Sequence, residues 1–62
     1  MVDGIKELLQ ASLQEQVPVE VYFGQVKLRG VVTRVEPFFI EIRHENRRTA
    51  IDLRQIIAVT QE

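Results

Sequence analysis

The chain has 62 residues, no cysteine and a formal net charge of −1 at pH 7. A chain this short forms a single domain, residues 1–62, and buries only about 60% of the surface that its unfolded form exposes. Without cysteine it has no disulfide or thiolate metal site, and one histidine does not make a histidine-built site. We therefore expect no metal or cofactor, and we expect association with further copies to supply stability.

Charge and hydropathy narrow the function further. The charge balance falls far short of the pI above about 9 that would mark a nucleic-acid module on charge alone, but in a symmetric ring every charge is repeated and a modest positive patch becomes a belt. No apolar run approaches the roughly 20 residues that a membrane span needs. The first residues lack the basic segment and the following apolar core of a signal peptide. We expect a cytoplasmic protein with no membrane partner.

Residues 3–16, DGIKELLQASLQEQ, are predicted to form a helix. Apolar side chains recur there at i, i+3, i+4 and i+8, which is one stripe at the helical period: Ile5, Leu8, Leu9 and Leu13. Pro18 forces the residue before it out of the α region, so the helix ends near Gln16. A helix with one apolar stripe must lie on another element.

The next two segments alternate as strands do. In residues 17–23 the apolar side chains Val17, Val19, Val21 and Phe23 fall on one face, and Glu20 and Tyr22 fall on the other. Gly24 begins a short turn, since glycine accepts a positive φ. Residues 26–36 form a long second strand whose alternation slips near Gly30, and a glycine at such a slip predicts a bulge or a sharp bend.

Three more strands are predicted at residues 38–43, 47–54 and 56–60. Alternation places Phe38 on the same face as Ile40 and Ile42. Five short strands with a bent second member indicate a small, partly open barrel. The last strand is short and apolar, and such an edge is a template for another chain, so we expect edge-to-edge pairing into a closed ring.

Taken in order, four stretches of the sequence resemble one family: VPVEVYF (17–23), VKLRG (26–30), VEPFFIEI (35–42) and RQIIAV (54–59). They are similar to the Hfq family of bacterial Sm-like RNA chaperones, within the wider Sm/LSm group. The resemblance spans roughly residues 5–60. It implies a mainly β fold, in which an N-terminal α-helix is followed by a strongly bent five-stranded antiparallel sheet, the Sm-like small open barrel. It also implies a homo-oligomeric ring, with a hexamer as first choice, and single-stranded RNA as the partner.

On the ring face that bears the helices, this family binds uridine-rich RNA near the inner rim. The resemblance places Phe38 at the aromatic that stacks on a base, and it places Arg54 and Gln55 at a Lys-His pair that contacts base and phosphate. Gln55 keeps hydrogen-bonding capacity where the family has histidine. Without the resemblance, Phe38 reads as a core residue, and Arg54 as the ion-pair partner of Asp52 or of a carboxylate on the next subunit.

On the opposite ring face, the family binds adenine-rich RNA through a tyrosine of the first strand and polar residues of the second. The resemblance places Tyr22, Lys27 and Arg29 at these positions. A tyrosine beside two cations suits base stacking and phosphate contact. The simpler interpretation is a solvated strand face. We expect this face to be the main RNA site and the one with Phe38 to be the lesser site.

Departures from the family pattern support an alternative function. Pro37 stands where the family has a glutamine before the aromatic, and the arginine patch late in the family's helix is replaced by Leu13, Gln14 and Gln16. The alternative is an Sm-like ring that serves as a scaffold for protein–protein interaction, with a protein partner and weak or no RNA binding.

The remaining polar residues give no catalytic arrangement. Ser12 lies on the predicted helix without a candidate base, and the single histidine, His44, has no nucleophile to activate. We expect the protein not to be an enzyme. The segment RHENRR, residues 43–48, is interpreted as a solvated hairpin end, and phosphate contact is the alternative.

Overall fold

The computed structural model describes residues 3–61. One helix is followed by five strands and a short 3₁₀ turn: α1 (Asp3–Glu15), β1 (Val19–Phe23), β2 (Val26–Val35), β3 (Phe39–His44), β4 (Arg47–Asp52), the turn Leu53–Gln55, and β5 (Ile56–Gln61). The predicted helix and five strands are confirmed, and each boundary falls within two residues of its prediction.

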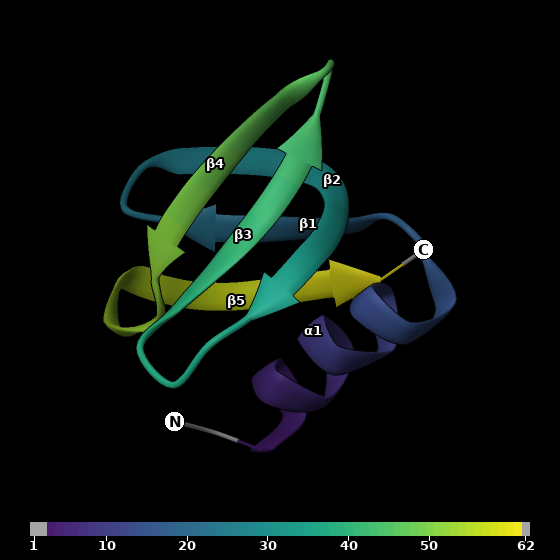
Figure 1. Ribbon diagram of the computed structural model, residues 1–62. Helices are drawn as coiled ribbons and strands as arrows, with labels where there is room; N and C mark the ends of the chain where they lie inside the picture. The colour runs from purple at the N-terminus through teal and green to yellow at the C-terminus, as the bar shows by residue number, and fades with distance from the viewer. Residues whose placement is uncertain (1–2, 62) are drawn as a thin grey trace.

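The five strands form one antiparallel sheet in the order β4-β3-β2-β1-β5. The two halves of β2 have different neighbours, since residues 26–30 pair with β1 and residues 31–35 pair with β3. The sheet therefore folds over on itself at the middle of β2. Figure 1 shows β3 and β4 crossing in front of β1 and β5, which is the strongly bent sheet that the sequence predicts.

Gly30 lies at this bend because only glycine fits there. A Cβ atom on Gly30 would overlap the backbone carbonyl oxygen of Arg43 on β3. The predicted bend at Gly30 is confirmed, but the slip in alternation has a different origin. Val32 keeps the inward parity of Leu28, and the slip comes from a bulge between Val32 and Arg34.

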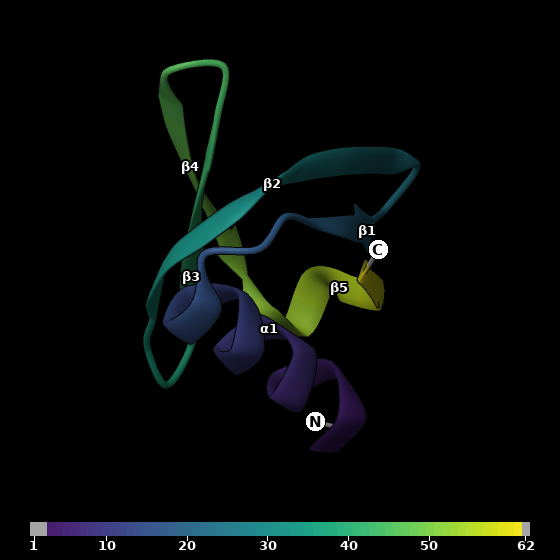
Figure 2. The same ribbon diagram turned by 90° about the vertical axis from the view of Figure 1, so that its right-hand side faces the viewer.

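The core lies between the two halves of the sheet and under the helix. Its buried side chains come from the helix and from all five strands: Leu9, Val19, Val21, Val32, Ile40, Ile42, Ile51 and Ile56. The helix packs mainly on β2 and β5 and leaves the tip of the β3–β4 hairpin at the opposite end of the molecule (Figures 1 and 2). Within residues 3–61 no helix is long and apolar enough to span a membrane.

One polar side chain, Ser12, is fully buried in this core. Its hydroxyl donates to the carbonyl oxygen of Val17 at 2.6 Å and accepts from the amide of Val32 at 3.0 Å. Beyond Gly30, β2 no longer pairs with β1, so this hydroxyl takes the place of the missing strand. An unpaired polar group at this buried position would reduce the free energy of unfolding, so both bonds stabilise the fold. The bond from the Val32 amide joins α1 to β2 and holds the helix on the sheet.

Candidate nucleic-acid interface

The first candidate surface, here called the Tyr22 surface, consists of Glu20, Tyr22, Lys27 and Arg29. Tyr22 is the direct partner of Lys27 across β1 and β2, and Glu20 is the direct partner of Arg29. The alternating residues of β1, Val19 and Val21, are fully buried, so this set points away from the core. The structure therefore brings together Tyr22, Lys27 and Arg29, which the resemblance in sequence predicts as one site.

Glu20 lies on the predicted face beside Tyr22, but it is not among the residues that the resemblance in sequence assigns to the RNA site. The Tyr22 hydroxyl donates to Oε1 of Glu20 at 3.3 Å, and Nζ of Lys27 lies 3.8 Å from Oε2. The side chain of Lys27 is 57% exposed, and a solvent-exposed ion pair of this length contributes about 0–1 kcal/mol. A phosphate could therefore compete with Glu20 for Lys27. Strand alternation in the sequence predicts that Glu20 shares the face of Tyr22, and the structure adds its contacts with Tyr22 and Lys27.

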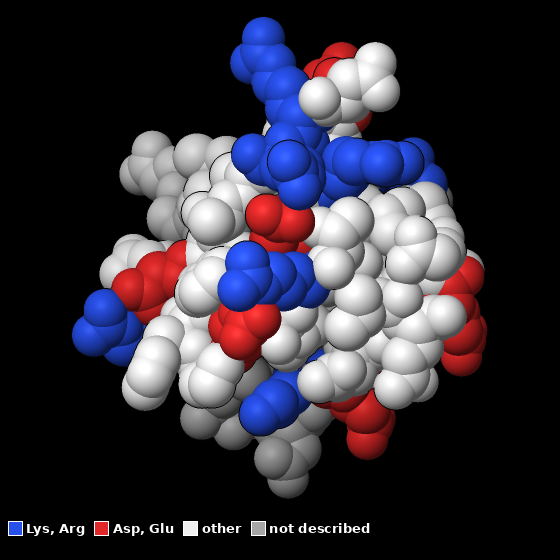
Figure 3. Space-filling view, in the orientation of Figure 1, with Lys and Arg blue, Asp and Glu red and all other residues white. Residues whose placement is uncertain are grey.

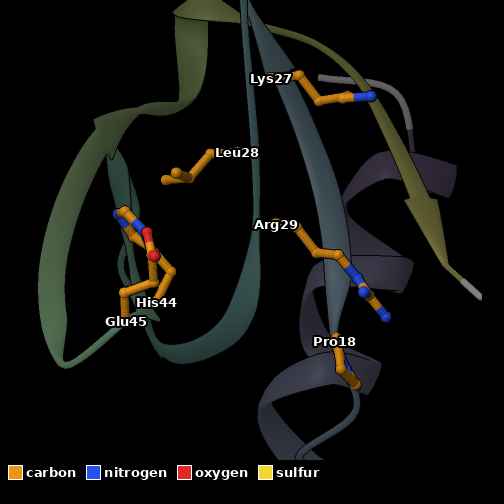
Figure 4. A pocket seen from close by; sticks show the side chains of 6 residues that line it. All are labelled: Pro18, Lys27, Leu28, Arg29, His44 and Glu45. Carbon is orange, nitrogen blue, oxygen red and sulfur yellow. The ribbon is translucent and has the colours of Figure 1, made fainter.

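An open hollow of about 580 Å³ adjoins the Tyr22 surface. It lies between β2 and the β3–β4 hairpin, and it is lined by Pro18, Lys27, Leu28, Arg29, His44 and Glu45. Figure 4 shows Leu28 directed toward the hairpin, whereas Lys27 and Arg29 extend toward the other side of β2. The hollow thus has an apolar floor at Leu28 and Pro18, with cations at its border.

The second candidate surface, here called the Phe38 surface, consists of Phe38, Arg54 and Gln55. Phe38 is 79% exposed, and its carbonyl oxygen accepts a hydrogen bond of 2.9 Å from the amide of Leu53. That bond ties the β2–β3 connection to the 3₁₀ turn that carries Arg54 and Gln55. The structure therefore places these three residues at one end of the molecule.

The exposure of Phe38 corrects one prediction. Alternation placed Phe38 with Ile40 and Ile42 on the core face, but β3 begins at Phe39 and Phe38 faces solvent. The cause is Pro37, which has no amide N–H for the strand ladder and holds the chain in a bend. The interpretation of Phe38 as a core residue is wrong.

Arg54 is held by Asp52 within the same chain. Nη2 of Arg54 lies 2.7 Å from Oδ2 of Asp52, and Nε donates to Oδ1 at 3.1 Å. Asp52 also accepts the backbone amide of Arg54 at 2.9 Å and so caps the 3₁₀ turn. These contacts lower the pKa of Asp52 to about 2 and raise the pKa of Arg54. The side chain of Arg54 is still 84% exposed, so Asp52 orients it without covering it.

The described residues hold no group of three His, Cys, Asp or Glu side chains that could bind a metal ion. What the two surfaces offer is an aromatic ring, a nearby cation and a neutral or acidic hydrogen-bonding group. Such a set suits the stacking of a base and the contact of a phosphate.

No family model and no curated protein sequence matches the chain. Solved structures do match it, and one of them is the crystal structure of the pleiotropic translational regulator Hfq. The two structures agree with a TM-score of 0.84 over 100% of each chain, at 18% sequence identity. At an identity this low, the structural agreement shows a shared fold and nothing further. The chain has the Sm-like fold of Hfq, an N-terminal helix followed by a bent five-stranded antiparallel sheet.

Proposed function

We propose that this chain is a ring-forming protein that binds single-stranded RNA, of the RNA chaperone or post-transcriptional regulator type. The single observation that carries the proposal is Phe38. Phe38 is 79% exposed, and its backbone is hydrogen-bonded to the turn that carries the oriented Arg54, so its ring is well suited to stack on a base. The fold adds support, because it is that of a translational regulator.

The two surfaces have different roles in this proposal. The Tyr22 surface binds adenine-rich RNA and supplies most of the affinity, since two cations accompany its tyrosine. The Phe38 surface binds uridine-rich RNA, with Arg54 on phosphate and Gln55 on the base edge. Stacking on an aromatic contributes about 1–3 kcal/mol per base, so a single pocket of either kind is weak.

Ring formation supplies the remaining affinity. The two edge strands of the sheet are β4 and β5, and within residues 3–61 each pairs with a neighbouring strand along one side only. On β5, Ile57 is 66% exposed. We propose that β4 of one subunit pairs with β5 of the next, and the resemblance in sequence favours a hexamer. A ring repeats each weak pocket around one axis, so that one RNA strand gains avidity by occupying several pockets.

The proposal assigns no catalytic activity and a cytoplasmic location. The residues of both surfaces bind and orient a strand, and none of them is a nucleophile beside a base.

The test compares two variants on two homopolymers. Tyr22→Ala/Arg29→Ala should lose most of the affinity for oligoadenylate, while Phe38→Ala should weaken binding of oligouridylate by about 5–150-fold, the equivalent of 1–3 kcal/mol. Lys6→Ala is the control, because Lys6 is exposed on α1 and belongs to neither surface. Thermal melts check that each variant folds. Wild-type protein that binds neither polymer at low salt would refute the proposal.

One observation favours a second function, a ring that acts as a protein-interaction scaffold. Glu20 lies within the Tyr22 surface, close to both Tyr22 and Lys27, and its charge opposes that of a phosphate. In this case the exposed Phe38 would insert into a protein partner. Capture of a protein by wild type and its loss in Phe38→Ala, without any RNA binding, would support the scaffold.

A further inference from the structure

The tip of the β3–β4 hairpin, residues 43–48, carries three arginines against one glutamate. Figure 3 shows that Lys and Arg side chains gather at this end of the molecule, whereas positive and negative side chains alternate lower on the same face. Arg43, Arg47 and Arg48 are all exposed. The hairpin tip is thus a local positive surface on a chain whose net charge is slightly negative.

The arginines of the hairpin tip repel one another. Arg43 is the direct cross-strand partner of Arg48, and like charges in that position destabilise a pair of strands. Glu41 lies 4.0 Å from Arg48, but among residues 3–61 no acidic side chain lies within ion-pair distance of Arg43 or Arg47. Among the described residues, the positive charge of the tip is therefore only partly neutralised, and an added anion would be attracted to Arg43 and Arg47.

The backbone presents these arginines rigidly. The turn consists of two residues, Glu45 and Asn46, with φ of 49° and 65°. Positive φ at both positions is the requirement of the tight two-residue hairpin turn. The arginines consequently stand on paired strands, at fixed spacing, and little backbone freedom is lost when they bind a ligand.

The hollow described above joins the hairpin tip to the Tyr22 surface. Its lining includes His44 and Glu45 from the tip as well as Lys27 and Arg29 from β2 (Figure 4). Lys27 and Arg29 thus belong both to the Tyr22 surface and to the border of a hollow whose other wall is part of the hairpin tip.

We propose that Arg43, Arg47 and Arg48 form a further contact surface for the phosphodiester backbone of single-stranded RNA, continuous with the Tyr22 surface. This inference rests on the proposed RNA binding. Phosphate contacts carry no base information, so this surface raises affinity for adenine-rich and uridine-rich strands alike. An acidic peptide would also match the charge. RNA is favoured because Lys27, which lines the hollow, is the cross-strand partner of Tyr22, on which a base can stack.

The experiment measures binding of an oligoadenylate and an oligouridylate, long enough to cross a whole ring, over a series of salt concentrations. Removal of one arginine–phosphate interaction should reduce the slope of log K against log[salt] by about 0.7, which is about fivefold in affinity at 0.1 M salt. Because Arg47→Gln removes one arginine from every subunit, we expect this change for each subunit that the strand contacts, and twice the change in slope for Arg43→Gln/Arg47→Gln, with both RNAs. Lys6→Gln removes the same single charge on exposed helix surface and should leave the slope unchanged. Arg47→Lys should retain the affinity, because the ammonium also binds phosphate.

The outcomes separate this inference from the function on which it rests. Wild-type protein that binds neither RNA overturns both. Wild-type binding with equal salt slopes in Arg43→Gln/Arg47→Gln and Lys6→Gln overturns the hairpin surface and leaves the proposed function standing. Binding of polyglutamate that depends on Arg43 and Arg47, with RNA binding unaffected, assigns the tip to an acidic protein and also overturns the inference. Thermal melts of every variant exclude a loss of binding caused by unfolding.

Discussion

Replacing Gly30 with alanine adds one methyl group where two strands approach most closely. Its Cβ atom would overlap the carbonyl oxygen of Arg43 and lie 3.1 Å from the carbonyl carbon of Arg43 and from Cγ1 of Ile42. The oxygen belongs to the backbone of β3, so it cannot turn aside as the end of a long side chain would. Either β2 and β3 separate or the bend opens.

The cost follows from two opposing effects. Overpacking of this kind lowers the free energy of unfolding by about 1–3 kcal/mol. Alanine also restricts the unfolded chain more than glycine does, which raises the free energy of unfolding by about 0.4–1 kcal/mol. We therefore expect Gly30→Ala to lower the free energy of unfolding by about 1–2 kcal/mol, and Gly30→Val to lower it further. In a domain of this size each kcal/mol shifts Tm by about 4–8 °C, so Tm should fall by about 4–16 °C.

The assay is thermal unfolding followed by circular dichroism at one fixed protein concentration, because association makes Tm depend on concentration. Gly4→Ala is the matched control. Gly4 is exposed on α1, and a Cβ atom there meets nothing within 4 Å, so alanine should leave Tm unchanged or raise it. If Gly30→Ala melts with the wild type, the close approach at the bend does not exist in solution.

Three further predictions concern assembly, the buried hydroxyl and pH. Ile57→Lys places a charge on the exposed side of β5 and should shift sedimentation toward smaller species at the same micromolar concentration; unchanged sedimentation would place the interface elsewhere. Ser12→Ala leaves the amide of Val32 unpaired and should destabilise by about 1–3 kcal/mol, so an unaltered melting curve would contradict the bridging role. Asp52 has a pKa lowered from 3.8 to about 2 by Arg54, so its ion pair contributes stability above about pH 4 that is lost as pH falls toward 2. The Tm difference between wild type and Arg54→Gln should shrink over that range, and a constant difference would argue against the ion pair.

The sequence predicts the order of elements well because each element has a clear period. The apolar stripe of α1 recurs at helical spacing, and Leu9 from that stripe is fully buried. Alternation in β1 likewise predicts the buried Val19 and Val21. It also predicts that Tyr22 and Lys27 face away from the core, and the short turn at Gly24 then brings them into register.

Other features are not encoded by a period. The exposure of Phe38 follows from its neighbour Pro37, which ends the ladder and overrides the alternation, whereas the bulge at Val32–Arg34 depends on how β2 meets the more distant β3. The sequence around Ser12 offers no candidate base and so no role for its hydroxyl, yet its partner is 20 residues away on β2. The ion pairing of Glu20 is visible only once β1 and β2 are paired in register.

The hydroxyl of Ser12 also makes one amide a reporter of helix motion. The N–H of Val32 donates to a helix side chain, so its proton becomes available to solvent when α1 lifts from the sheet, even while the strands stay paired. Buried positions in the β1–β2 ladder, such as Val21, exchange only when the strands themselves separate. Hydrogen exchange at Val32 therefore measures undocking of α1 as a local opening, distinct from global unfolding. Comparison of the exchange rate of the Val32 amide with and without bound RNA would show whether RNA binding changes how often α1 lifts from the sheet.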